Sequence, residues 1–185
     1  MELFLTSLFW FLVAAVFAVV EIEVEGKHGW AEKTSTWFRT KGLAAKLYGL
    51  AMGVPWSPAR ELLVLAMYFV WMPTWDFLWF VLNPYYGVKK FKKQNVWWHN
   101  RSHWLFNITP LDYLFGWGLS VMLSGLAAWL ASDGVLLIRH SYFMIWFLFF
   151  TVVTILLVAP LYKRWHAKMR QRDDRDSSGI FHQEG

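Results

Sequence analysis

Three carboxylates alternate along the chain where its first apolar run ends: Glu21, Glu23 and Glu25. If this run is helical and continues to Gly26, Glu21 and Glu25 lie one turn apart on one face, while Glu23 points elsewhere. Two carboxylates at this spacing can bind a metal ion or exchange a proton. The alternative is that all three solvate a helix end and pair with nearby lysines.

Two histidines four residues apart, His99 and His103, lie in the sequence WWHNRSHW. On a helix their imidazoles share a face, which is the geometry of a His-x3-His metal pair. Together with the acidic residues, the pattern suggests Glu21, Glu25, His99 and His103 as metal ligands. The alternative is an interfacial helix within residues 88–106, with its tryptophans at headgroup level and its lysines on lipid phosphates.

Asp76 lies inside a long apolar run, about 9 Å from the run's end at Leu82 if the run is helical. An ionisable group at that depth in a membrane is costly, so it is a candidate for a functional role. Pro73 frees a backbone carbonyl one turn earlier, which makes a structural role for Asp76 the alternative. If the protein is an enzyme, we expect Asp76, Glu25 and His99 to be its acid and base groups.

The composition indicates which solvent the fold needs and which chemistry is excluded. Hydrophobic residues make up 57% of the 185 residues and charged residues only 17%, which is too apolar for a soluble domain. There is no cysteine, so thiolate metal sites, iron–sulfur clusters and cysteine nucleophiles are excluded. A metal site made of histidine and carboxylate alone would suit iron, manganese or zinc. We expect no nucleic-acid partner, because the basic residues lie mostly beside apolar runs.

The chain has four uncharged or nearly uncharged runs that are long enough to cross a bilayer as helices. They are residues 3–20, 62–82, 113–131 and 142–162. A fifth segment, 42–57, is short and contains Lys46. It either crosses the membrane, lies in the interface plane as an amphipathic helix, or is re-entrant. We predict an all-α, polytopic transmembrane bundle with about five membrane segments in a single domain, 1–162. Residues 163–185 are expected to form a polar, disordered cytoplasmic tail.

The distribution of basic residues favours five crossings over four. With five, every lysine and arginine lies on the cytoplasmic side except Lys46 within the fifth segment and Arg60 and Arg139 outside. This predicts a multi-pass protein of the cell membrane with its N-terminus outside and its C-terminus in the cytoplasm. Five crossings also place the acidic and histidine candidates on one side of the membrane, whereas four would split them.

Two functions remain open from the sequence. The first is a non-catalytic accessory or scaffold subunit that packs against membrane lipids and other membrane protein subunits. The second is a metal-dependent membrane enzyme that acts on a lipid or isoprenoid substrate at the cytoplasmic interface. Transport of ions or protons through Asp76 ranks last, because it requires a second polar group in mid-membrane.

Overall fold

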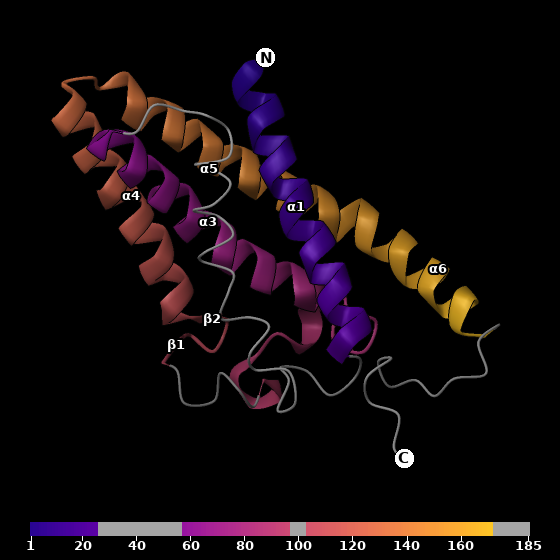
Figure 1. The fold of residues 1–185 in the computed structure, drawn as a ribbon. Helices are drawn as coiled ribbons and strands as arrows, with labels where there is room; N and C mark the ends of the chain where they lie inside the picture. The colour runs from indigo at the N-terminus through magenta and orange to yellow at the C-terminus, as the bar shows by residue number, and fades with distance from the viewer. Residues whose placement is uncertain (26–56, 97–102, 172–185) are drawn as a thin grey trace.

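The computed structural model describes residues 1–25, 57–96 and 103–171, and these residues form the predicted all-α bundle (Figure 1). Its long helices are α1 (Glu2–Glu25), α3 (Pro58–Leu82), α4 (Leu111–Ala131) and α5 (Val135–Val153). A π-helical turn, η5 (Thr154–Val158), joins α5 to α6 (Ala159–Arg170). The loop before α4 holds two 3-10 turns, η2 (Val88–Lys90) and η3 (Lys93–Asn95), and a small antiparallel hairpin, β1 (Trp104–Leu105) and β2 (Thr109–Pro110).

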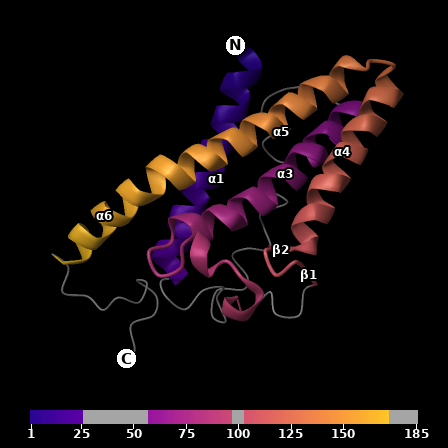
Figure 2. The ribbon, with the colours of Figure 1, turned by 180° about the vertical axis from the view of Figure 1, so that it is seen from behind.

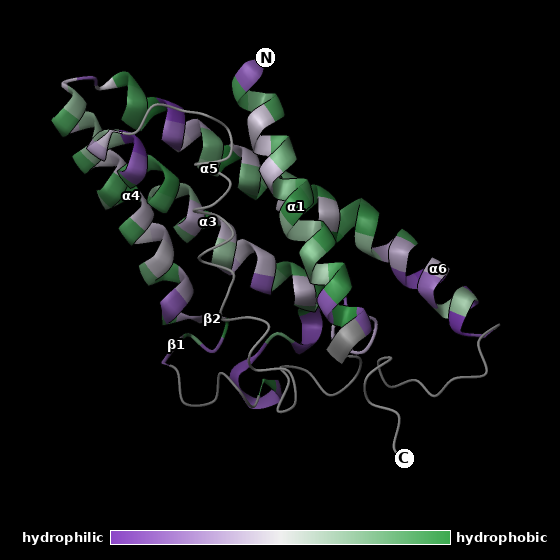
Figure 3. Cartoon of the chain, viewed as in Figure 1, coloured by the Kyte–Doolittle hydropathy of each residue, from purple (hydrophilic) through white to green (hydrophobic). Residues whose placement is uncertain are grey.

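Within the described residues, four helices are long and apolar enough to cross a membrane: α1, α3, α4 and the continuous α5–η5–α6 helix. They contain the four predicted runs, so the prediction of a multi-pass membrane protein is confirmed. Figure 3 shows apolar residues along these helices and polar residues gathered in the loop before the hairpin and along α6. The fifth predicted segment, 42–57, lies outside the described residues apart from Ser57.

Local signals explain why α3 begins and ends where it does. The hydroxyl of Ser57 accepts a hydrogen bond from the backbone N–H of Arg60 at 3.3 Å, which caps the helix start, and Pro58 takes the first helical position. At the other end Asn83 precedes Pro84, and its Oδ1 accepts the backbone N–H of Tyr85 at 2.9 Å. The helix therefore ends at Leu82, where the apolar run ends, because a residue before proline disfavours the helical conformation.

The helices α1, α3 and α5 all run in the same direction (Figures 1 and 2). Their N-terminal ends meet around one cavity, which Leu3, Leu63 and His140 help to line. The helix α4 runs antiparallel to α3, because its start lies against Asp76 and its middle lies against Ala66. The chain therefore leaves α1 at one end of the bundle and enters α3 at the other.

Small residues let α3 and α4 pack closely. Buried Gly116, Ser120, Ser124 and Ala128 recur every fourth position of α4, and α3 and α4 form the most extensive helix pair in the described bundle. A Cβ atom added at Gly116 would lie 3.3 Å from the carbonyl oxygen of Phe69. This carbonyl receives no helical hydrogen bond from residue 73, because Pro73 has no N–H. Small residues at fourfold spacing are typical of helix contacts in membranes.

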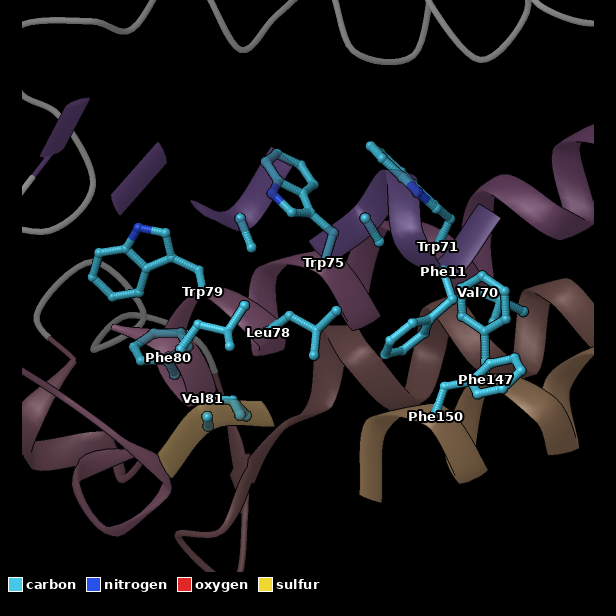
Figure 4. Close-up of a cluster of buried hydrophobic side chains, with 14 of the residues drawn as sticks. Phe11, Val70, Trp71, Trp75, Leu78, Trp79, Phe80, Val81, Phe147 and Phe150 are labelled. Atoms are coloured by element: carbon cyan, nitrogen blue, oxygen red, sulfur yellow. The ribbon is translucent and has the colours of Figure 1, made fainter. Parts of the chain in front are cut away.

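Aromatic side chains fill the spaces between the other helices (Figure 4). Phe11 of α1 meets Phe147 and Phe150 of α5 with ring centroids 5.7 and 5.3 Å apart. Trp71 stacks on Trp75 at 5.3 Å, and Phe17 of α1 meets the edge of Trp71. Trp71, Trp75 and Trp79, one turn apart along α3, are all buried and contribute to helix packing.

Residues 88–96 differ from the continuous interfacial helix that we predicted within 88–106. They form two separate 3-10 turns, and residues 97–102 lie outside the described part of the chain. The reason is the inward burial of Phe91 and Val96, whose spacing of five does not place them on one face of an α-helix. The two short turns bury both side chains and leave Lys89, Lys90 and Lys92 exposed.

The start of the predicted tail is also more ordered than expected. Residues 163–170 continue α6, so the helix that begins at Val135 runs for 36 residues to Arg170. Its length, about 54 Å, exceeds a hydrocarbon core of about 30 Å. Pro160 has no N–H for the helical ladder, and the wider π turn just before it lets the helix continue. Residues 172–185 lie outside the described chain.

Candidate functional site

Asp76, which we predicted as a catalytic residue, forms a hydrogen bond between two helices. The hydroxyl of Tyr113, at the start of α4, donates to Oδ2 of Asp76 on α3. Phe91 stacks on the ring of Tyr113 with centroids 5.9 Å apart and shields the pair. Both partners are half-buried, so this polar contact replaces the water that the carboxyl group loses inside the bundle.

Replacing Tyr113 with phenylalanine removes the hydroxyl that donates to the carboxyl group of Asp76. We expect Tyr113→Phe to lower the free energy of unfolding in detergent by about 1–2 kcal/mol. Asp76→Asn should cost less, because its amide oxygen still accepts the hydroxyl. Tyr142→Phe, which changes an exposed tyrosine of α5, is the control. Equal stability of the Tyr113 and Tyr142 variants in denaturant titration would show that the hydrogen bond contributes nothing.

A second cluster joins the end of α1 to α6. Nη2 of Arg170 lies 2.6 Å from Oε2 of Glu23, and Nε2 of His166 lies 3.5 Å from its Oε1. His166 and Arg170 are four residues apart and therefore share a face of α6. Tyr162 is one turn earlier, and its buried hydroxyl has no hydrogen-bond partner among the described residues.

This cluster was missed by sequence reasoning. Glu23 was predicted to point away from the Glu21–Glu25 pair, and it is the carboxylate that bridges to another helix. The available signal was the spacing of Tyr162, His166 and Arg170 at every fourth position. That signal has meaning only if the segment is helical, and the charge-rich sequence predicted disorder instead.

A third polar contact lies at the opposite end of the bundle. The hydroxyl of Ser120 donates to the carbonyl oxygen of Ala66 at 2.7 Å and lies 2.7 Å from Nε2 of buried His140. Because its single proton is used on Ala66, Nε2 of His140 is the protonated nitrogen that donates to Ser120. His140 also borders a cavity of about 230 Å³, together with Glu2 and Arg139. These contacts connect α3, α4 and α5.

The predicted metal ligands are not brought together in the part of the chain that the structure describes. Glu21 is buried on α1, and His103 is exposed at the start of the hairpin. The side chain of Glu25 and the whole of His99 lie outside the described residues. Among described residues, no group of three histidine, aspartate or glutamate side chains is close enough to hold one ion.

The described candidates nevertheless lie at one end of the bundle. Glu21 is near the end of α1, Asp76 is in the last third of α3, and His103 precedes the hairpin that leads into α4. The lysines of residues 89–93 lie at this end too, whereas Arg60 and Arg139 lie at the other end, at the starts of α3 and α5 (Figure 1).

Comparison of the chain with models of protein families, with curated proteins and with solved structures gives no match.

Proposed function

We propose that the protein is a non-catalytic accessory or scaffold subunit of a membrane, which packs against lipids and partner membrane proteins. The observation that carries this proposal is the use of its ionisable side chains. Asp76 binds Tyr113, Glu23 binds Arg170, and His140 binds Ser120, so each contact holds one helix against another. Side chains used in this way stabilise a fixed helix arrangement, which is what a scaffold needs.

The outward face of α4 supports packing against a helix of a partner protein. Phe115, Met122 and Trp129 recur every seven residues on this helix and are exposed. Gly118 and Gly125 lie between them, and a Cβ atom at either position would meet no other atom within 4 Å. Such glycines allow the backbone of a second membrane helix to approach closely.

The proposal is tested by photo-cross-linking from this face in native membranes. The chain has no cysteine, so Met122→Cys carries a single benzophenone label. We expect one discrete, heavier protein adduct from Met122→Cys. Val152→Cys, on the exposed side of α5, is the matched control and should give lipid adducts. If Met122→Cys also gives only lipid adducts, α4 faces lipid and the scaffold proposal fails at this face.

The charge distribution supports a cytoplasmic C-terminus and an N-terminus outside. The basic loop 88–96 and the basic helix α6 lie at the end of the bundle where α1 finishes, and Arg60 and Arg139 lie at the other. Because basic loops remain in the cytoplasm, the first end is the cytoplasmic one. A protease that is confined to the outside should therefore leave a C-terminal epitope intact.

The second candidate is the metal-dependent enzyme acting on a lipid or isoprenoid substrate. Glu23, Tyr162 and His166 bring acid and base groups together at the same end as Asp76, which favours it. Elemental analysis of the purified wild type beside a His99→Ala, His103→Ala double variant distinguishes the two functions. Stoichiometric iron, manganese or zinc that the double variant loses would replace the scaffold proposal with the enzyme. Absence of metal from both proteins would contradict the enzyme.

A further inference from the structure

The hairpin before α4 exposes apolar side chains at its tip. Three residues, 106–108, connect the paired residues Leu105 and Thr109. Within this loop Phe106 and Asn107 have φ +49° and +61°, and the N–H of Ile108 donates to the carbonyl oxygen of Leu105 at 2.9 Å. Two successive positive φ values identify a type I′ turn. The side chain of Phe106 is 84% exposed, and Leu105 and Ile108 are also exposed.

Phenylalanine is an unfavourable residue for this turn. The left-handed backbone region suits glycine and asparagine, and a bulky side chain there is a rare and strained choice. The strained backbone conformation of Phe106 is accompanied by an aromatic ring at the tip of the hairpin. Strained residues of this kind concentrate where binding requires a particular side chain.

Asn107 connects the hairpin tip to the lysine-containing segment 89–93, called here the cationic turn. Its Oδ1 accepts the backbone N–H of Lys93 at 3.2 Å, and its Nδ2 donates to Oε1 of Gln94 at 3.0 Å. The apolar tip and the cationic turn are thus held as one unit. Lys89 and Lys92 are exposed beside Lys93, while the ammonium of Lys90 donates to the carbonyl oxygen of Tyr85.

This unit lies at the start of a helix that is long and apolar enough to span a membrane. The N–H of Leu111, the first residue of the membrane-spanning helix α4, donates to the carbonyl oxygen of His103 at 2.8 Å. Trp104 packs on Phe91 with centroids 5.3 Å apart, which holds the hairpin against the end of the bundle (Figure 1). Aromatic residues at such a position partition into the headgroup region, and lysines there attract anionic lipids.

We infer that the hairpin is an interfacial lipid-binding element: Leu105, Phe106 and Ile108 insert into the headgroup–acyl boundary while Lys89, Lys92 and Lys93 bind anionic phospholipid headgroups. The inference shares with the proposed function the placement of the chain in a membrane and does not depend on a partner protein. It specifies where the proposed scaffold contacts lipid, at the hairpin, and which lipids it prefers there, those with anionic headgroups.

The insertion is tested with a nitroxide on Phe106→Cys in the full chain, reconstituted in phosphatidylcholine vesicles that contain phosphatidylglycerol. We expect the nitroxide to collide mainly with oxygen, which concentrates in the acyl region. The same label on Asp133→Cys, in the exposed turn between α4 and α5, should collide mainly with a water-soluble nickel chelate. Equal access of nickel to both labels would overturn the inference.

The headgroup contact is tested with a triple variant, Lys89→Gln, Lys92→Gln and Lys93→Gln. A lysine near an anionic surface contributes about fivefold in binding, so we expect the triple variant to retain at least about tenfold less phosphatidylglycerol than wild type through purification. Retention equal to wild type would overturn the contact. The lysine triple variant should keep the cross-link from Met122→Cys, so failure here is separable from failure of the scaffold proposal.

Discussion

Phe80→Ala is expected to lower the free energy of unfolding by about 3–5 kcal/mol. The side chain of Phe80 is 0% exposed and packs against Phe91 and Tyr86, with ring centroids 4.7 and 5.9 Å apart. It therefore holds the end of α3 to the loop that carries the cationic turn. Truncation leaves a cavity among rigid aromatic rings, which cannot move together to close it.

The measurement is denaturant unfolding of the purified protein in detergent, followed by tryptophan fluorescence. Phe115→Ala is the matched control, because Phe115 is also a membrane-helix phenylalanine but is 71% exposed. We expect the control to stay within about 0.5 kcal/mol of wild type. A Phe80→Ala loss no greater than that of the control would mean that the loop does not depend on Phe80 for its position.

Gly116→Leu is expected to lower the free energy of unfolding by about 3 kcal/mol, because it forces α3 and α4 apart. A Cβ atom alone would already lie 3.3 Å from the backbone oxygen of Phe69, and a backbone atom cannot rotate away as a side chain can. The longer leucine side chain must displace the helix. The contact between Asp76 and Tyr113 joins the same two helices and should be lost with it.

Gly118→Leu provides the control for this substitution. Gly118 is on the same helix, half a turn away, and a Cβ atom there would meet nothing within 4 Å. Both substitutions change helix propensity equally, so their difference in unfolding reports the packing of α3 on α4. If the two leucine variants unfold at the same denaturant concentration, the close approach at Gly116 is not what stabilises the pair.

The membrane-spanning helices were predictable because their requirements are local. A run of about 20 apolar residues crosses the hydrocarbon as a helix whatever it packs against, since no water is available for an unpaired backbone. The end of α3 was equally local, because Pro84 restricts the residue before it. Only residues within one segment enter these arguments.

The loop 88–96 and the helix 163–170 were not predictable in the same way. Each is shaped by contacts with distant parts of the chain. Phe91 and Val96 turn inward onto the bundle, and His166 and Arg170 meet Glu23 of the first helix. Composition alone describes these segments as basic and polar, which suits an interfacial helix or a disordered tail equally well.

The sequence by itself determined that the chain is a bundle of apolar helices, that any metal site must use histidine and carboxylate, and which ionisable groups lie at costly depths. Only the tertiary structure decided what those groups bind. Asp76 and Tyr113 are 37 residues apart, and Glu23 and Arg170 are 147 apart. Such pairs depend on the direction and rotation of each helix in the bundle, which close packing between helices sets and no single segment encodes.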